Sequence, residues 1–241
     1  MSRPARLVST TIPVRRVDAP TRDTMWALLE THYEGVTRER FEADLDAKDH
    51  VILLRSHGAL RGFSTLQRLS GEVLGKPYRA VYSGDTVIDP AFHGQTALQI
   101  AFYRYVFTTR LMSPTLPLFW FLISKGYKTY LLLSRNFPEH WPRRDQATPP
   151  WQAAVLDDLA SRKFGAAWHP VRGVLIFDPP AGRLRAGVAP VEPALDDPDV
   201  AFFVARNPGH ARGDELCCLG RVDRTFAWSY GWKALRKRSG R

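Results

Sequence analysis

The chain has 241 residues, 44% of them hydrophobic, and a formal net charge of +10. This length and apolar content are ample for one large domain, or for a domain with a substantial extension. The charge indicates an anionic partner, such as a phosphate-bearing small molecule, nucleic acid or an anionic lipid surface. Charge alone does not distinguish among these partners. Part of the excess lies at the end of the chain, in Lys233, Arg236, Lys237, Arg238 and Arg241, which predict a basic helical end or a solvated tail.

The cysteine usage and the hydrophobic stretches indicate a cytoplasmic protein. Cys217 and Cys218 are adjacent, so in an extended segment they point to opposite faces and form no easy disulfide. Residues 1–20 carry four arginines and no apolar core of the kind that a secretory signal has. The most apolar stretch, residues 116–123, is far shorter than the roughly 20 residues that cross a bilayer. We therefore expect no membrane span.

The first half of the chain predicts strands and helices in alternation. Residues 8–17 predict a strand, and Thr21 is the expected cap of the helix that follows. A second helix is expected from Thr37. Residues 51–55 and 60–67 predict a hairpin, and a loop at 71–76 leads to a strand at 78–88. From Gly94 the spacing of Leu98, Phe102 and Val106 predicts a helix that is buried on one side.

The second half predicts fewer regular elements. Residues 116–123 predict a central strand, residues 125–137 a short helix or an irregular segment, and residues 151–164 a helix that ends at Gly165. Pro138, Pro142, Pro149 and Pro150 are expected to exclude regular structure until Trp151. Residues 171–177 predict a strand. Residues 200–206 and 215–219 predict a final strand pair, with Asn207-Pro208-Gly209 as the hairpin turn.

The most informative stretch is the strand, proline turn and helix between residues 86 and 97. The first turn of a helix has unpaired backbone N–H groups and the positive end of the helix dipole, so it can bind a phosphate group. Gly94 would let the backbone approach the anion closely. The residues expected to form this cradle are His93, Gly94, Gln95, Thr96 and Ala97. The alternative is an ordinary helix start with a glycine in the turn.

These residues resemble a motif of the GNAT acyltransferase family. Val87-Ile88-Asp89-Pro90 and then His93-Gly94-Gln95-Thr96-Ala97-Leu98 are similar to its hydrophobic-x-Pro step and the Arg/Gln-x-x-Gly-x-Gly/Ala loop that opens a helix. His93 stands where a basic residue is common, and Thr96 and Leu98 replace later small residues. The order of elements over about residues 8–178 also resembles that of the family.

The resemblance implies a fold and a co-substrate. The fold would be α/β, with a mixed, mostly antiparallel twisted sheet flanked by helices. Acetyl-CoA or another acyl-CoA would lie in a splay between two strands, where Thr86, Val87 and Ile88 offer backbone groups, with Ser124 and Lys125 across the cleft. Residues 1–178 would form the core, and residues 179–241 a C-terminal extension packed on it, within one structural domain.

Acyl transfer to an amine needs a base and an acid that protonates the leaving thiolate. Asp85 is the expected base, because strict alternation would place it on one face with Ser83 and Val87, where the family often has a carboxylate. The alternative is an ion pair with an arginine. Tyr127 and Tyr130 are the expected acids by resemblance, and the alternative for both is aromatic packing.

The expected function is an acyl-CoA-dependent N-acyltransferase that transfers an acyl group, with acetyl the expected one, to an unidentified small-molecule or protein amine. The alternative is a catalytically inactive GNAT-like binding module for nucleic acid or an anionic surface. An enzyme that uses nucleotides through another fold would need a lysine-bearing phosphate loop. His210, Asp214 and Glu215 do not have the spacing of a metal site, so no metal is expected. The acceptor and the oligomeric state are left open.

Overall fold

A computed structural model describes residues 5–178, 183–184, 195–223 and 226. The chain divides into two compact units. Unit 1 comprises Met1–Arg68, Tyr82–Thr108 and Ala181–Ala189, and unit 2 comprises Leu69–Val81, Thr109–Pro180 and Pro190–Arg241. The basic residues at the C-terminus, from Lys233 onward, lie outside the described residues.

Unit 1 is built on a sheet with the strand order β1-β3-β4-β5. These strands are β1 (Val8–Pro13), β3 (His50–Ser56), β4 (Ala59–Val73) and β5 (Lys76–Ile88). β3 pairs antiparallel with both β1 and β4. The predicted hairpin is confirmed, while β4 and β5 are longer than predicted, because only Leu74 and Gly75 separate them. Parts of both strands belong to each unit.

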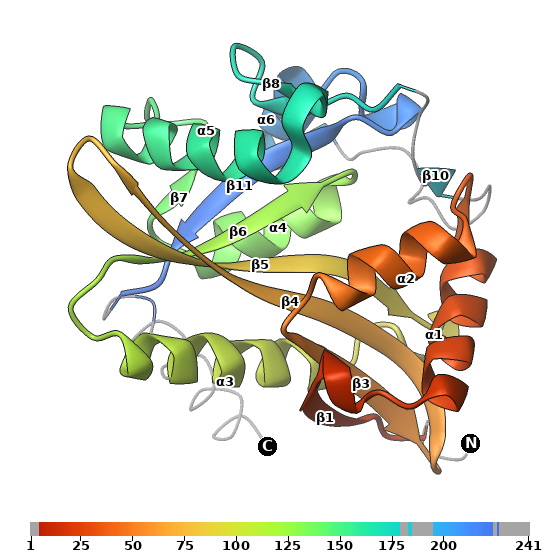
Figure 1. Ribbon diagram of the computed structural model, residues 1–241. Coiled ribbons are helices and arrows are strands. Elements are labelled where there is room, and N and C mark those ends of the chain that lie inside the picture. The colour runs from red at the N-terminus through yellow and green to blue at the C-terminus, as the bar shows by residue number, and fades with distance from the viewer. Residues whose placement is uncertain (1–4, 179–182, 185–194, 224–225, 227–241) are drawn as a thin grey trace, which may run out of the picture. The chain divides into compact units, whose positions relative to one another are not determined.

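Two helices of unit 1, α1 (Ala19–His32) and α2 (Arg38–Asp46), lie beside this sheet (Figure 1), and they bury apolar side chains in a core that they share with it. The shared core contains Met25, Leu29, Phe41, Leu45, Val51, Leu53, Phe63 and Val87. The cap of α1 differs from the predicted Thr21, because the Asp18 carboxylate accepts the backbone N–H of Thr21. The Thr37 side chain caps α2 in the same way.

Short elements complete unit 1. A 3-10 turn, η1 (Val14–Arg16), replaces the last part of the predicted first strand. β2 (Tyr33–Glu34) pairs with β10 (Arg183–Leu184) in a separate two-stranded sheet. After β5 come η2 (Pro90–Phe92) and α3 (Ala97–Met112), so the helix begins three residues after the predicted Gly94. Gly94 has φ of +82°, which is incompatible with the start of a right-handed helix.

Unit 2 has its own antiparallel strands around β11 (Glu215–Arg221). β11 pairs with β6 (Leu118–Ser124), β7 (His140–Trp141) and β9 (Val174–Leu175), and β9 pairs with β8 (Trp168–His169). The predicted central strand at residues 116–123 is confirmed as β6, whose side chains are nearly all buried. β7 lies within the proline-rich stretch where regular structure was not expected. Pro142 follows it directly, so β7 is only two residues long.

The helices of unit 2 are α4 (Tyr127–Asn136), α5 (Pro150–Phe164) and α6 (Pro198–Arg206), with short 3-10 turns η3 (Gly165–Ala167) and η4 (His210–Arg212). The prediction of a strand at residues 200–206 is wrong. Asp197 caps this segment, Pro198 occupies its first turn, and Val200 and Phe203 are buried at helical spacing. Asn207-Pro208-Gly209 therefore connects a helix to β11, not two strands.

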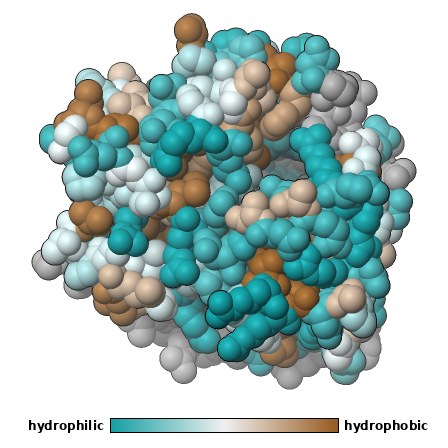
Figure 2. Space-filling model, in the orientation of Figure 1, coloured by the Kyte–Doolittle hydropathy of each residue, from teal (hydrophilic) through white to brown (hydrophobic). Residues whose placement is uncertain are grey.

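The predicted fold class is confirmed: β3 pairs antiparallel with β1 and β4, β11 pairs antiparallel with β6, and helices pack beside the sheet in each unit. The predicted boundary at residue 178 falls between β6 and β11, which pair with each other. Within the described residues, no helix is long and apolar enough to cross a membrane. On the face in Figure 2, hydrophobic residues form small separate groups among hydrophilic ones.

Candidate functional site

The turn between β5 and α3 holds the residues predicted to bind a phosphate, and all of them lie in unit 1. His93 and Gly94 are exposed, and a Cβ added to Gly94 would meet no atom within 4 Å. The Thr96 carbonyl accepts the N–H of Ile100 at 3.0 Å, so Thr96 directly precedes the helix. The backbone from Gly94 to Ala97 therefore lies at the positive end of a helix of 16 residues.

Two predicted ligands in this turn have side-chain contacts with the protein itself. The His93 imidazole donates from Nε2 to the Ile88 carbonyl at 3.0 Å. The Gln95 amide donates to the Ala5 carbonyl and accepts the Leu7 N–H. These contacts fix the shape of the turn. Because the His93 and Gln95 side chains are engaged in them, an anion at this turn would be bound by backbone N–H groups.

Arg61, which belongs to no motif of the sequence, holds the turn against β4. The Asp89 N–H donates to the Arg61 carbonyl at 2.8 Å, and the Arg61 guanidinium lies 3.4 Å from the Asp89 carboxylate. The same guanidinium lies over the Phe92 ring, 5.6 Å from its centroid. Arg61 and Asp89 are 28 positions apart, so only the strand pairing brings them together.

The strand before the turn approaches its neighbour closely. A Cβ on Gly62 of β4 would lie 2.6 Å from the Val87 carbonyl oxygen, which is too close for any side chain. Val87 itself is buried in the core beside α1 and α2. The Thr86 side chain is exposed, with its hydroxyl 2.7 Å from that of Ser64. Gly62 therefore permits the strand spacing at the point where β5 ends.

The alternation of side chains along β5 is interrupted between Gly84 and Val87. Val87 belongs to the same buried core cluster as Phe63, and a Cβ on Gly84 would lie 2.6 Å from the Thr65 hydroxyl. Since Phe63 and Thr65 lie on one face of β4, Gly84 and Val87 face the same way although they are three residues apart. An extra residue is thus accommodated in β5, as in a β-bulge, a feature that is frequent beside active sites.

This bulge changes the predicted surroundings of Asp85. Ser83 and Val87 lie on opposite faces of the strand, so the expectation that Ser83, Asp85 and Val87 share one face is wrong. Strict alternation was the wrong rule here, because it holds only in a strand without an extra residue. Asp85 is half-buried and lies within the interrupted stretch.

The other predicted site residues belong to unit 2 and follow β6. Ser124 is buried, and its hydroxyl donates to the Gly126 carbonyl at 2.8 Å. The Lys125 ammonium lies 3.4 Å from the carboxylate of Glu215, whose side chain is 8% exposed. Both side chains therefore contribute to the junction between β6, β11 and α4.

The two candidate acids differ in exposure. Tyr130 is fully buried, and its hydroxyl donates to the Pro142 carbonyl at 3.0 Å. Burial is the main reason why the pKa of Tyr130 lies well above its usual value. Tyr127 is half-buried at the start of α4. Of the two, Tyr127 has the more accessible side chain.

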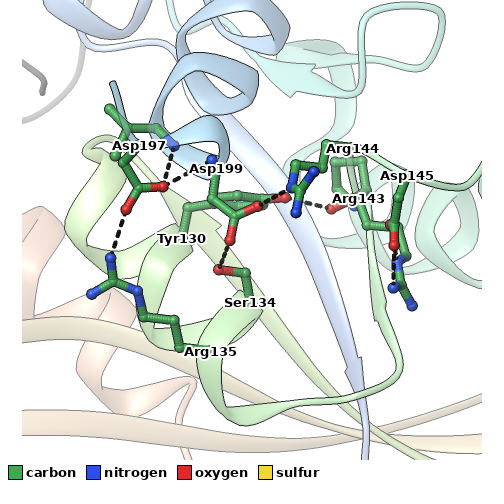
Figure 3. A network of polar contacts seen from close by, with 10 residues as sticks. Tyr130, Ser134, Arg135, Arg143, Arg144, Asp145, Asp197 and Asp199 are labelled. Carbon is green, nitrogen blue, oxygen red and sulfur yellow. Dashed lines mark hydrogen bonds and ion pairs between the residues drawn. The ribbon is translucent and has the colours of Figure 1, made fainter. Parts of the chain in front are cut away.

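A network of ion pairs surrounds Tyr130 in unit 2 (Figure 3). Asp199 accepts hydrogen bonds from Ser134 on α4 and from Arg144, and Arg135 donates to Asp197 at 2.7 Å. These contacts fasten the start of α6 to α4 and to the segment after β7. Nothing in the sequence spacing indicated them, since α6 was expected to be a strand.

The described residues contain no group of three or more histidine, cysteine, aspartate or glutamate side chains that could hold a metal ion. The histidine and acidic residues near the start of β11 have other contacts. His210 bonds the Asn207 carbonyl through Nδ1 at 2.9 Å, and the Asp214 carboxylate lies 3.8 Å from both Arg172 and Arg212.

No protein-family model matches the chain, and no curated protein matches it. Among solved structures, a probable N-acyltransferase from Enterococcus faecalis has a TM-score of 0.41 at 14% identity, over 53% of this chain and 32% of that one. This chain thus spans about a third of that protein. An aminoglycoside N-acetyltransferase in complex with CoA has a TM-score of 0.41 at 13% identity, over 62% of this chain and 99% of that one.

A third solved structure, a GNAT family N-acetyltransferase from Escherichia coli in complex with CoA, has a TM-score of 0.37 at 12% identity. It is matched over 66% of its length by 52% of this chain. These three structures are similar to 52–62% of this chain, at 12–14% identity.

Proposed function

We propose that this protein is an acyl-CoA-dependent N-acyltransferase. The observation that carries the proposal is the β5–α3 junction, where a bulged strand leads through an exposed glycine turn into the start of a long helix. The backbone N–H groups of Gly94 to Ala97 would bind the CoA diphosphate, and the backbone of Thr86 to Ile88 the pantetheine arm. A cytoplasmic location is part of the proposal.

In this proposal the substrate amine attacks the thioester carbonyl, so that a C–N bond forms and the C–S bond breaks. Asp85 would take the proton that the amine loses, directly or through a water molecule, and Tyr127 would give a proton to the leaving thiolate. The exposure of Tyr127 favours it over Tyr130, whose hydroxyl is buried and bonded to Pro142. Acetyl is the proposed acyl group.

The phosphate site is tested by calorimetric titration of acetyl-CoA into the wild type and Gly94→Asp. The new carboxylate would repel the diphosphate, so we expect at least about a tenfold loss of affinity. Gly58→Asp is the matched control, because Gly58 also has a positive φ of +80° and open space around it, in the β3–β4 turn of the same unit. Equal affinity of the two variants would contradict the phosphate site.

The catalytic roles are tested with Asp85→Asn and Tyr127→Phe, assayed by release of free CoA in the presence of a panel of amines. Loss of general base or general acid catalysis lowers kcat by about 10²- to 10⁴-fold. Acetyl-CoA affinity should stay within about twofold for both variants, since neither side chain is proposed to bind the phosphates. Wild-type kcat in both variants would remove these residues from the mechanism.

The second candidate function is a GNAT-like binding module without turnover, and the net charge of +10 is the observation that favours it. Such a module would bind nucleic acid or an anionic surface with a steep salt dependence. A wild type that binds a DNA duplex in this way, has no measurable affinity for acetyl-CoA and releases no CoA would support this candidate over the enzyme.

A further inference from the structure

Residues 5–7, directly before β1, are fastened to the turn between β5 and α3 by the side chain of Gln95. Its Nε2 donates to the Ala5 carbonyl at 3.0 Å, and its Oε1 accepts the Leu7 N–H at 2.9 Å. The bonded positions are 90 and 88 residues apart along the chain, and all of them belong to unit 1. Arg6 lies between the two backbone groups that Gln95 bonds, so the fold brings an arginine beside this turn.

The position of Arg6 is fixed on both sides. Leu7 is 4% exposed and leads directly into β1, which pairs with β3 along its whole length, while Ala5 is held by Gln95. Arg6 itself is exposed, and a buried residue next to an exposed one is the alternation of an extended segment. Among the described residues, the Arg6 guanidinium has no hydrogen-bond or ion-pair partner. Its donors are therefore available to a ligand.

A diphosphate at this turn would meet little full positive charge from the turn itself. The His93 ring is bonded to the Ile88 carbonyl, and the Arg61 guanidinium lies 3.4 Å from the Asp89 carboxylate, which offsets its charge. The backbone N–H groups at the start of α3 supply only the partial charge of the helix dipole. Arg6 is an exposed cation that Gln95 holds beside the same turn, and it can supply the charge that the turn lacks.

The arginine side chain is long enough for this contact. One glutamine side chain and one hydrogen bond span the distance from the turn to residues 5–7. An arginine side chain is longer than a glutamine side chain, so the Arg6 guanidinium can reach back to an anion bound at Gly94. Its five N–H donors lie in a planar fork that matches the oxygens of a phosphate group.

On the basis of the CoA site proposed above, we propose that Arg6 binds the diphosphate of CoA and that Gln95 is the positioning residue that holds Arg6 there. The segment before β1 is then part of the co-substrate site. Gln95 contributes through the two backbone groups that it bonds and does not itself touch the phosphates.

The Arg6 contact is tested by calorimetric titration of CoA at about 150 mM salt, where charges more than about 8 Å apart are largely screened. Arg6→Gln should weaken CoA binding at least about fivefold, because a charge-assisted contact to phosphate is lost. Arg6→Lys keeps the charge without the fork, so its affinity should lie between the two. The matched control is Arg16→Gln, since Arg16 is also exposed and β1 separates it from Arg6 by about 20 Å. It should bind CoA as the wild type does.

Dephospho-CoA identifies the phosphate group, because it keeps the diphosphate and lacks the 3′-phosphate. The loss caused by Arg6→Gln should be the same for CoA and dephospho-CoA, within about twofold. A loss confined to CoA would assign Arg6 to the 3′-phosphate and overturn its contact with the diphosphate.

The role of Gln95 is tested by a double-mutant cycle. Gln95→Leu removes both bonds to residues 5–7 and should weaken CoA binding about as much as Arg6→Gln does. In the Arg6→Gln background the same substitution should have no further effect, because its only consequence for binding is the release of Arg6. A purely structural role of Gln95 in the turn would weaken binding equally in both backgrounds, and that result would overturn the positioning role.

Failure of this inference differs from failure of the CoA site itself. A wild type without measurable affinity for CoA would remove the proposed function and the role of Arg6 together. A wild type that binds CoA, is weakened by Gly94→Asp and is unaffected by Arg6→Gln would keep the phosphate site and overturn the role of Arg6 alone.

Discussion

The β5–α3 junction of unit 1 and the β6–α4 junction of unit 2 are both strand–turn–helix segments, and they differ in what their side chains do. The first has an eight-residue connection whose side chains bond backbone groups nearby, while its own backbone is exposed at Gly94. The second has a two-residue connection. In it, Lys125 pairs with Glu215 of β11, and Tyr130 in the following helix is buried and bonded to Pro142 after β7. A long turn leaves backbone groups accessible to a ligand, whereas a short one uses its side chains in the core.

The largest effect is expected at the β6–α4 junction, where removal of its two tyrosines tests which side chain belongs to the core. Tyr130→Ala should lower the free energy of unfolding by about 3–5 kcal/mol, because a fully buried aromatic side chain and its hydrogen bond to Pro142 are lost. Tyr127→Ala should cost about 1 kcal/mol or less, since Tyr127 is half-buried. Urea denaturation measures both. Similar losses for the two variants would contradict the difference in burial between these side chains.

A smaller effect is expected at the ion pair after β6. Lys125→Met removes a charged partner of Glu215, which is 6% exposed, and should cost about 1–3 kcal/mol. Adding Glu215→Gln should restore part of the loss, because the remaining side chain is then neutral. The double-mutant cycle, measured by urea denaturation at low and high salt, gives the coupling between the two. A coupling of zero would exclude a structural role for the pair.

The close approach of β4 to Gly84 predicts that an alanine at position 84 would be strained. Gly84→Ala should lower stability by about 1–3 kcal/mol, because its Cβ would press on the Thr65 hydroxyl and on the Lys48 side chain. In a Thr65→Ala background the same substitution should cost clearly less, since the closest atom is gone. Thermal unfolding of the four proteins in this cycle measures the difference. Additive effects would mean that Gly84 does not face Thr65.

The smallest effect concerns pH. His50, whose Nδ1 lies 3.2 Å from the Tyr105 hydroxyl, has a lowered pKa because burial disfavours its charged form, with a further contribution from Arg68. The folded state therefore binds this proton less well than the unfolded state does. The associated stability is present above about pH 6.5 and is lost as the pH falls through the pKa of the folded protein.

His50→Gln should accordingly flatten the decrease in unfolding free energy between about pH 7 and pH 5. Urea denaturation at several pH values measures the slope. His140, on β7, contributes in the same direction because burial lowers its pKa as well, so His50→Gln should remove only part of the slope. An unchanged slope would assign the pH dependence in this range to other groups.

Local patterns predicted most elements of unit 1, because its strands and helices have apolar residues at regular spacing. They failed at residues 200–206, where the run of Val, Phe and Phe favours a strand by composition, while Asp197 and Pro198 together set a helix start. For the site, sequence placed Gly94 and the turn before α3. It missed Arg61, whose contact with Asp89 depends on strand pairing, and the bulge at Gly84, which depends on contacts with β4.

The route of the chain through the two units has a consequence for dissecting the protein. The backbone passes from one unit to the other at 68/69, 81/82, 108/109, 180/181 and 189/190. Each unit therefore consists of three separate stretches of the chain. A gene fragment that begins or ends at one of these points does not encode a complete unit. A single protease nick should likewise leave two pieces that stay together until a denaturant is added.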